Sequence, residues 1–268
     1  MELFVLFACG IAVGVLGALL GIGGGVLLVP VLVYLVKVPI HHAIAISLIS
    51  IIATSAHVAS FGIKQGFTNI RLGLFLEIFS TSGAILSSIL AVKMHGDILT
   101  RIFALSLIIT SFFMFYQPRN SETPEYDEKE LKYFGGTFFD PTRNRMLRYN
   151  VQNLPAVTGL TFLAGVLSGM VGTSGGVFMV PLMKLLGKIP MRAAADTSSL
   201  LIGVTALGGA ITYFRAGYVE VNLLAPIVMG IMAGVFVGNR LKMKVKSVWL
   251  KRMFALILVI TAIKMFMG

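Results

Sequence analysis

The chain is poor in charge for its length. Only 12% of its 268 residues are Asp, Glu, Lys or Arg, whereas 57% are hydrophobic and the mean hydropathy is +0.91. A soluble domain carries about 25% charged residues. This shortage argues against a soluble fold and predicts an integral membrane protein.

Cysteine and histidine are scarce too. The single cysteine, Cys9, lies in an apolar run, so the chain can form no intramolecular disulfide and no cysteine-based metal site. The four histidines are the adjacent pair His41 and His42, together with His57 and His95. They give little from which to build a catalytic or metal centre, so we expect no enzyme, no cofactor and no metal.

Alternation of apolar and polar residues is missing from the long apolar runs, which argues against the ~10-residue strands of a membrane β-barrel. Residues 43–63, 72–92 and 98–116 are continuous apolar stretches, each close to the ~20 residues with which a helix crosses a bilayer. We expect an all-α polytopic membrane protein. The net charge of +11 sits mostly in short loops, as positive-inside topology requires, so we expect no nucleic-acid partner.

What the chain does have is a glycine-rich break inside its first apolar segment. The run Gly21-Ile22-Gly23-Gly24-Gly25 precedes Pro30, and Gly172-Thr173-Ser174-Gly175-Gly176 precedes Pro181 in the same layout 151 positions later. Glycine-broken apolar segments in corresponding positions of two halves indicate a transporter's binding site. A nucleotide-binding loop is excluded because no Lys-Ser/Thr pair follows the glycines.

The same ungapped register continues beyond the motif, for instance from Gly14 to Gly165 and from Gly83 to Gly234. We therefore predict two duplicated transmembrane repeats, residues 1–116 and 153–268. A polar linker over residues 117–152 joins them, and within it Tyr133–Pro141 is expected to form a short turn-rich element.

The orientation of the repeats depends on the first segment. If residues 3–20 cross the membrane, the halves run parallel. If 3–20 and 26–36 form a re-entrant hairpin, the halves are inverted. The inverted alternative places 17 of the 22 Lys and Arg residues on one side and five on the other, against 12 and 10 for the parallel one. This bias favours inverted repeats in the plasma (inner) membrane, with a cytoplasmic linker and both termini outside.

The doubled Gly-rich motif, the Asn153-Leu154-Pro155 entry to the second half and the run Asp196-Thr197-Ser198-Ser199 resemble the TauE/SafE family of sulfite and organosulfonate exporters. The resemblance covers almost the whole chain. It implies a polytopic transporter of small sulfur-containing or carboxylate anions, and leaves the particular substrate open.

Each break would place the N–H groups and positive dipole of a half-helix near the membrane midplane, where they can bind an anion without a buried cation. The alternative is that the glycines only allow close helix packing. Polar positions with helical spacing extend the candidate site; they line a substrate path or join helices. The substrate-binding candidates are Gly21, Ile22, Gly23, Gly24, Gly25, Gly172, Thr173, Ser174, Gly175, Gly176, Ser47, Thr54, Ser198 and Thr205.

Ionisable groups inside the spans are candidates for proton coupling because they are costly to bury. These are Asp196, Glu77 and His57. The alternatives are that Asp196 caps a helix N-terminus, that Glu77 lies near the interface and that His57 is a satisfied structural donor.

The leading hypothesis is a secondary transporter of small anions, an exporter, that works by alternating access around one central site with protons or another ion as coupling partner. An uncoupled anion channel with the same site is the first alternative. A membrane-embedded enzyme is the second.

Overall fold

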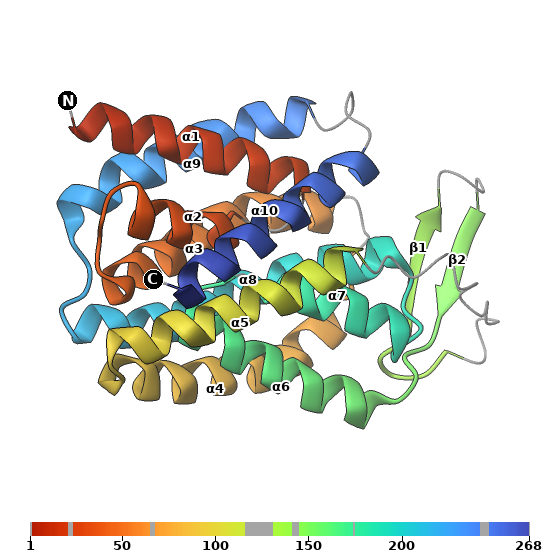
Figure 1. Cartoon of the computed structure of the whole chain (residues 1–268). Helices are drawn as coiled ribbons and strands as arrows, with labels where there is room; N and C mark the ends of the chain where they lie inside the picture. The colour runs from red at the N-terminus through yellow and green to blue at the C-terminus, as the bar shows by residue number, and fades with distance from the viewer. Residues whose placement is uncertain are drawn as a thin grey trace.

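The computed structural model describes residues 2–20, 24–64, 68–115, 131–140, 145–173, 175–241 and 247–267. Within these ranges the chain forms ten helices and one two-stranded sheet (Figure 1). The elements are α1 (Glu2–Leu20), α2 (Gly25–Tyr34), α3 (Ile40–Lys64), α4 (Ile70–Lys93), α5 (Gly96–Phe115), β1 (Gly136–Asp140), β2 (Arg145–Tyr149), α6 (Leu154–Val171), α7 (Gly176–Leu185), α8 (Met191–Arg215), α9 (Val221–Leu241) and α10 (Ser247–Met267).

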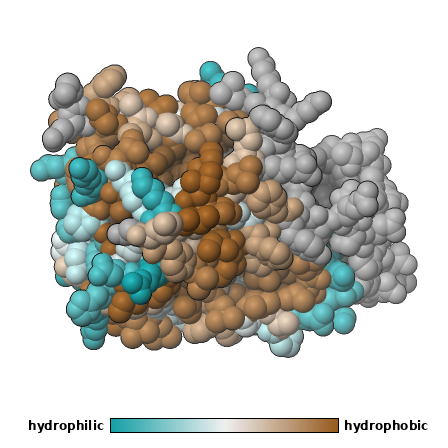
Figure 2. Space-filling model, in the orientation of Figure 1, coloured by the Kyte–Doolittle hydropathy of each residue, from teal (hydrophilic) through white to brown (hydrophobic). Residues whose placement is uncertain are grey.

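The helices form a membrane bundle, as the composition predicts. Five of those described are long and apolar enough to cross a bilayer: α4, α5, α6, residues 193–215 of α8 and residues 221–238 of α9. Large apolar side chains such as Leu74 and Ile78 remain exposed on α4. Figure 2 shows apolar atoms over the middle of the bundle and hydrophilic ones at its left end and at its lower right. Lipid contact accounts for an exposed apolar surface of this kind.

Helices at corresponding positions of the two halves pack in corresponding ways. Helix α1 lies along α9, and its counterpart α6 lies along α4. Glycine permits both contacts: a Cβ at Gly14 would come 2.9 Å from the Cα of Ile231, and a Cβ at Gly165 would come 2.9 Å from the Cα of Ser80. These two pairs occupy equivalent positions of the two repeats. The first helix of each repeat therefore packs against the other repeat, by the small-residue contacts common in membranes.

The linker departs from the prediction. The expected turn-rich element is instead the antiparallel hairpin β1–β2, in which Gly136 pairs with Tyr149 and Thr137 with Arg148. The hairpin docks on the bundle through Tyr149, which is 2% exposed and accepts a 3.3 Å hydrogen bond from Nδ2 of Asn69 at the start of α4. Burial raises the pKa of the Tyr149 phenol, and the bond with Asn69 opposes that rise. Tertiary contact thus fixes a segment whose local sequence indicated only turns.

Both ends of the chain lie at the left of the bundle in Figure 1, and β1–β2 lies at the right. Helix α1 begins at the left and the connection from α2 into α3 also lies there, whereas α6 begins at the right, beside the hairpin. Two hairpins, α1–α2 and α6–α7, thus enter the bundle from opposite ends. The inverted alternative requires this arrangement.

We expect the linker and the N-terminus to be accessible from opposite sides of the membrane. The test labels Thr137→Cys in a Cys9→Ser background with an impermeant maleimide in oriented vesicles, next to an N-terminal epitope tag probed by protease. Thr137 is exposed in β1, so labelling reports its side directly. Accessibility of both probes from the same side would establish parallel repeats.

Candidate functional site

Each repeat contains a helix break at its glycine motif. Helix α2 begins at Gly25 after Gly24, whose φ is +75°, and α6 ends before Gly172, whose φ is +68°. Both values lie in the left-handed region that glycine adopts without strain. The amides of Leu27 and Leu28 bond the carbonyl of Gly24, which leaves the first two N–H groups of α2 without an acceptor in their own helix.

The break before α7 has the same form. The amides of Phe178 and Met179 bond the carbonyl of Gly175 at 3.1 and 3.0 Å, so α7 also begins with N–H groups that lack an acceptor in their own helix. Helices α2 and α7 are each ten residues long, and each carries a proline at its sixth position. Two short helices thus present positive ends inside the protein.

Ser47 of α3 joins the two breaks. Its hydroxyl lies 2.7 Å from the carbonyl oxygen of Gly172 and 3.2 Å from that of Gly25, and the side chain is fully buried. A hydroxyl carries one hydrogen, so it donates mainly to the nearer carbonyl of Gly172. The structure therefore brings together two motifs that are 151 residues apart.

Thr173 has an unusual environment at the second break. The residue is 0% exposed, and its hydroxyl has no hydrogen-bond partner. Its carbonyl oxygen accepts a 2.8 Å bond from the hydroxyl of Ser168, so the backbone of the break is fixed while the side-chain oxygen stays open. Buried polar groups are nearly always paired, and an open one beside a helix N-terminus suits a ligand.

Close packing explains part of the glycine content. A Cβ at Gly25 would collide with Ile51, and a Cβ at Gly176 would collide with Ile202, the equivalent residue of the second repeat. A Cβ at Gly175 would meet only ordinary contacts, the nearest at 3.5 Å. The packing interpretation therefore holds for Gly25 and Gly176, whereas Gly24 is required by its backbone conformation. Gly21, Ile22, Gly23 and Ser174 lie outside the described residues.

The predicted polar stripe on α3 divides into two kinds of contact. Ser47 reaches other helices, while Ser50 donates to the carbonyl of Ile46 at 2.8 Å within α3. Thr54 likewise bonds the carbonyl of Ile51 at 3.0 Å, among its contacts. In α8, Ser198 donates to the carbonyl of Ala195 at 2.8 Å. Apart from Ser47, then, these hydroxyls bond the carbonyls of their own helices.

Glu77 lies in a polar cluster between α4 and α8. Its Oε1 accepts hydrogen bonds from the hydroxyls of Thr81 and Thr205, the latter at 3.1 Å, and Thr205 also lies 2.7 Å from the hydroxyl of Ser80. Oε2 of Glu77 is buried without a partner. Sequence reasoning selected Glu77 and Thr205 separately. It missed Ser80 and Thr81, although their spacing of three and four residues from Glu77 was the available signal.

A short chain of contacts links this cluster to the second break. The backbone of Ser80 packs against Gly165 of α6. Gly165 lies one turn before Ser168, whose hydroxyl bonds the carbonyl of Thr173. The carboxyl of Glu77 and the break at Gly172 are therefore connected through α4 and α6.

The structure describes the other two ionisable candidates only in part. Asp196 is half-buried in the second turn of α8 and has an interaction of its own. It does not cap the helix, because Pro190 holds the N-cap position, so the capping alternative is wrong. His57 lies in α3, and its side chain is outside the described part of the structure. Among the described residues, no three His, Cys, Asp or Glu side chains group as metal ligands.

Helices of membrane-spanning length, an apolar outer surface and two breaks inside the bundle define a polytopic helical membrane protein. The family model "Sulfite exporter TauE/SafE" matches residues 6–265. The chain therefore belongs to the TauE/SafE family.

Relatives of nearly the same length carry transporter names. The chain is 26% identical to YunE of Bacillus subtilis (strain 168), over 97% of this chain and 96% of that protein. It is 24% identical to MJ0441 of Methanocaldococcus jannaschii, over 94% and 91%. Both are named "Probable membrane transporter protein". No solved structure is significantly similar to the chain. Family and relatives together make this protein a membrane transporter.

The Ser47 bridge can be tested by its effect on stability. Ser47→Ala removes the donor to the Gly172 carbonyl and leaves a buried acceptor open, which costs about 1–3 kcal/mol. We expect the midpoint of thermal unfolding in detergent to fall by about 2–6 °C. Ser50→Ala is the matched control, because that buried hydroxyl bonds only its own helix. Equal shifts in the two variants would contradict a bridge between the breaks.

Proposed function

We propose that the protein is a secondary transporter of small anions whose substrate site lies between the two glycine breaks. The observation that carries this proposal is the fully buried, unpartnered hydroxyl of Thr173 at the second break, which Ser47 ties to the first break. Leaving such a hydroxyl unpaired costs about 1–3 kcal/mol, and a bound ligand with acceptor oxygens removes that cost.

Oxyanions match the donors of this site. The N-terminal amides of α2 and α7 and the Thr173 hydroxyl all donate, and helix N-termini bind negative oxygens without a buried cation. Sulfite, organosulfonates and small carboxylates share this chemistry. The family's description as a sulfite exporter supports export of sulfite or an organosulfonate as the first substrate class to test.

We infer that the repeats 1–116 and 153–268 are inverted, with the linker 117–152 on the cytoplasmic side of the plasma membrane. The placement of the chain ends opposite β1–β2 supports this inference (Figure 1). The charge bias supports it as well, since 17 of the 22 Lys and Arg residues then face the cytoplasm.

Alternating access has a structural counterpart in two end contacts. Asn69 and Glu220 hold equivalent positions, 151 residues apart. The backbone N–H of Asn69 donates to Oγ1 of Thr197 in α8 at 3.0 Å. Oε1 of Glu220 lies 3.0 Å from Nδ1 of His42 in α3, an ion-pair distance without hydrogen-bond alignment. Each end of the packed pair α3 and α8 thus carries one of these polar contacts. We propose that transport breaks the two contacts in turn.

Glu77 is the proposed proton carrier. Its Oε1 is held by two hydroxyls while Oε2 is buried and open, so a proton bound at Oε2 changes the charge of the α4–α8 contact. That contact is connected to the second break through Gly165. Asp196 and His57 are the alternative carriers.

Transport by purified protein in liposomes tests the site. We expect saturable uptake of at least one anion from a panel of sulfite, sulfoacetate, taurine and small carboxylates. Gly24→Ala should lower the initial rate about tenfold, because an L-residue at this φ costs about 1–2 kcal/mol and reorients the first amides of α2. Gly159→Ala, near the start of α6, is the control, since a Cβ there would meet no atom within 4 Å. Flux of none of these anions would overturn the proposed function.

Coupling through Glu77 is tested by a pH gradient. We expect the pH gradient no longer to stimulate flux in Glu77→Gln, because a glutamine side chain neither binds nor releases a proton. Flux driven by the anion's own concentration gradient should remain. Asp97→Asn, an exposed carboxyl in the first turn of α5, should behave as wild type. Wild-type flux that ignores the pH gradient would favour the uncoupled channel instead.

A further inference from the structure

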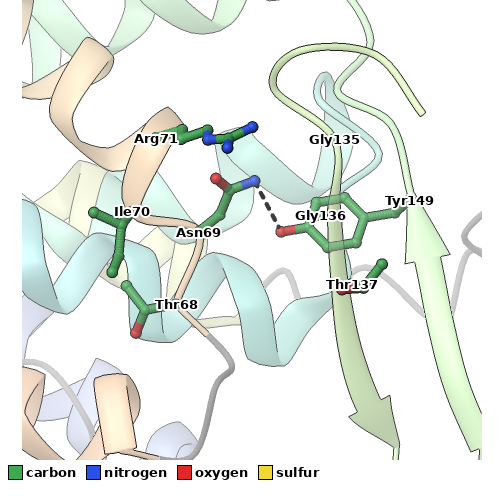
Figure 3. A pocket seen from close by; sticks show the side chains of 8 residues that line it. All are labelled: Thr68, Asn69, Ile70, Arg71, Gly135, Gly136, Thr137 and Tyr149. Carbon is green, nitrogen blue, oxygen red and sulfur yellow. Dashed lines mark hydrogen bonds between the residues drawn. The ribbon is translucent and has the colours of Figure 1, made fainter.

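A polar cavity lies outside the bundle core, where β1–β2 meets the start of α4. Its volume is about 230 Å³. Figure 3 shows its lining side chains, with the guanidinium of Arg71 extending from α4 toward the hairpin and Asn69 directed at the hydroxyl of Tyr149. The cavity is separated from the glycine breaks along the chain and comes from different elements.

The lining of this cavity is rich in donors and contains no acidic residue among those the structure describes. Arg71 supplies a cation with five N–H groups. Thr137 and Thr68 add hydroxyls, and Oγ1 of Thr68 is buried without a partner. Such a lining attracts an anion and offers little to a cation.

The backbone of the site adds to its positive character. Oδ1 of Asn69 accepts a 3.1 Å hydrogen bond from the backbone N–H of Leu72. The backbone carbonyl of Asn69 accepts one of 2.8 Å from the N–H of Gly73. These caps leave the amides of Ile70 and Arg71 without acceptors in α4. The guanidinium carbon of Arg71 also lies 5.8 Å from the ring centre of Tyr133, a contact that holds the cation beside the hairpin.

The size of the cavity selects the ligand. Pockets for drug-sized molecules measure about 300–1,000 Å³, so this smaller cavity suits a small tetrahedral or planar oxyanion. Gly136 keeps it open, since a Cβ there would come 2.7 Å from the Tyr149 hydroxyl and 3.1 Å from Nδ2 of Asn69.

We propose that this cavity, lined by Asn69, Arg71, Gly136 and Tyr149, is a second anion site that binds a small oxyanion such as phosphate, sulfate or sulfite at the linker side. The contacts of Asn69 show why the position of this cavity matters. The side-chain Nδ2 of Asn69 donates to the Phe134 carbonyl at 3.0 Å and to the Tyr149 hydroxyl, and its backbone N–H donates to the hydroxyl of Thr197. An anion on Arg71 therefore lies against the residue that holds the hairpin, α4 and α8 together.

Binding to the full-length protein in detergent tests the site independently of transport. Isothermal titration at constant ionic strength would use inorganic phosphate, sulfate and sulfite. We expect saturable binding of at least one of them. Arg71→Gln should weaken its affinity at least ~10-fold, because the variant loses a charge-assisted hydrogen bond. Gly136→Ala, which narrows the cavity, should weaken it as well. Arg101→Gln removes an exposed arginine of α5 and should leave binding unchanged.

The outcomes separate this site from the proposed transport site. Binding that is retained in Gly24→Ala, whose transport is slowed, and weakened in Arg71→Gln places the anion at Arg71. Phosphate that binds without being transported identifies a resident cytoplasmic anion, whereas bound sulfite that is also transported identifies the substrate itself. Unchanged affinity in both Arg71→Gln and Gly136→Ala would overturn the proposal. So would the absence of saturable binding up to about 10 mM of any of the three anions, because a dissociation constant above that concentration is too weak for a functional site.

Discussion

A carbonyl or amide buried in a membrane protein needs a partner, and the structure depends on how that need is met at the helix breaks. The carbonyl of Gly172 is bonded by Ser47 from the first repeat, and the carbonyl of Thr173 by Ser168 from its own helix. Because one of these bonds crosses between repeats, interrupting the helix also fixes one repeat against the other. Among the described side chains of the two breaks, the hydroxyl of Thr173 stays open, at the place proposed for the ligand.

Close glycine contacts determine which parts of the protein can move together. Helix α1 packs on α9 and α6 packs on α4, with backbones in contact at Gly14 and Gly165. Helix α1 is therefore held by the second half of the chain and α6 by the first, whereas α2 packs on α3 and α7 on α8 within their own halves. A rocking motion that keeps the glycine contacts would carry α1 with α9 and α6 with α4, so the moving units would mix residues from both halves of the sequence.

The two repeats share a scaffold but differ in chemistry. The α4–α8 contact contains Glu77, Ser80 and Thr205. The positions equivalent to Glu77 and Ser80 in α9 are Val228 and Ile231. Of these equivalent positions, only that of Glu77 carries a carboxyl. The proposed proton carrier would therefore act on one of the two contacts, which would make the two sides of a transport cycle energetically unequal.

The sequence by itself determined the membrane class, the helical spans, the duplication and the starts of α2 and α7, because hydrophobicity and glycine's backbone freedom act over neighbouring residues and repeat with the chain. It did not reveal β1–β2, whose strands become ordered against Asn69 through the buried Tyr149. Nor did it pair Ser47 with Gly172 or Glu77 with Thr205, which are 125 and 128 residues apart. Only the tertiary structure decides such contacts, because they depend on how helices cross, and no local pattern records that.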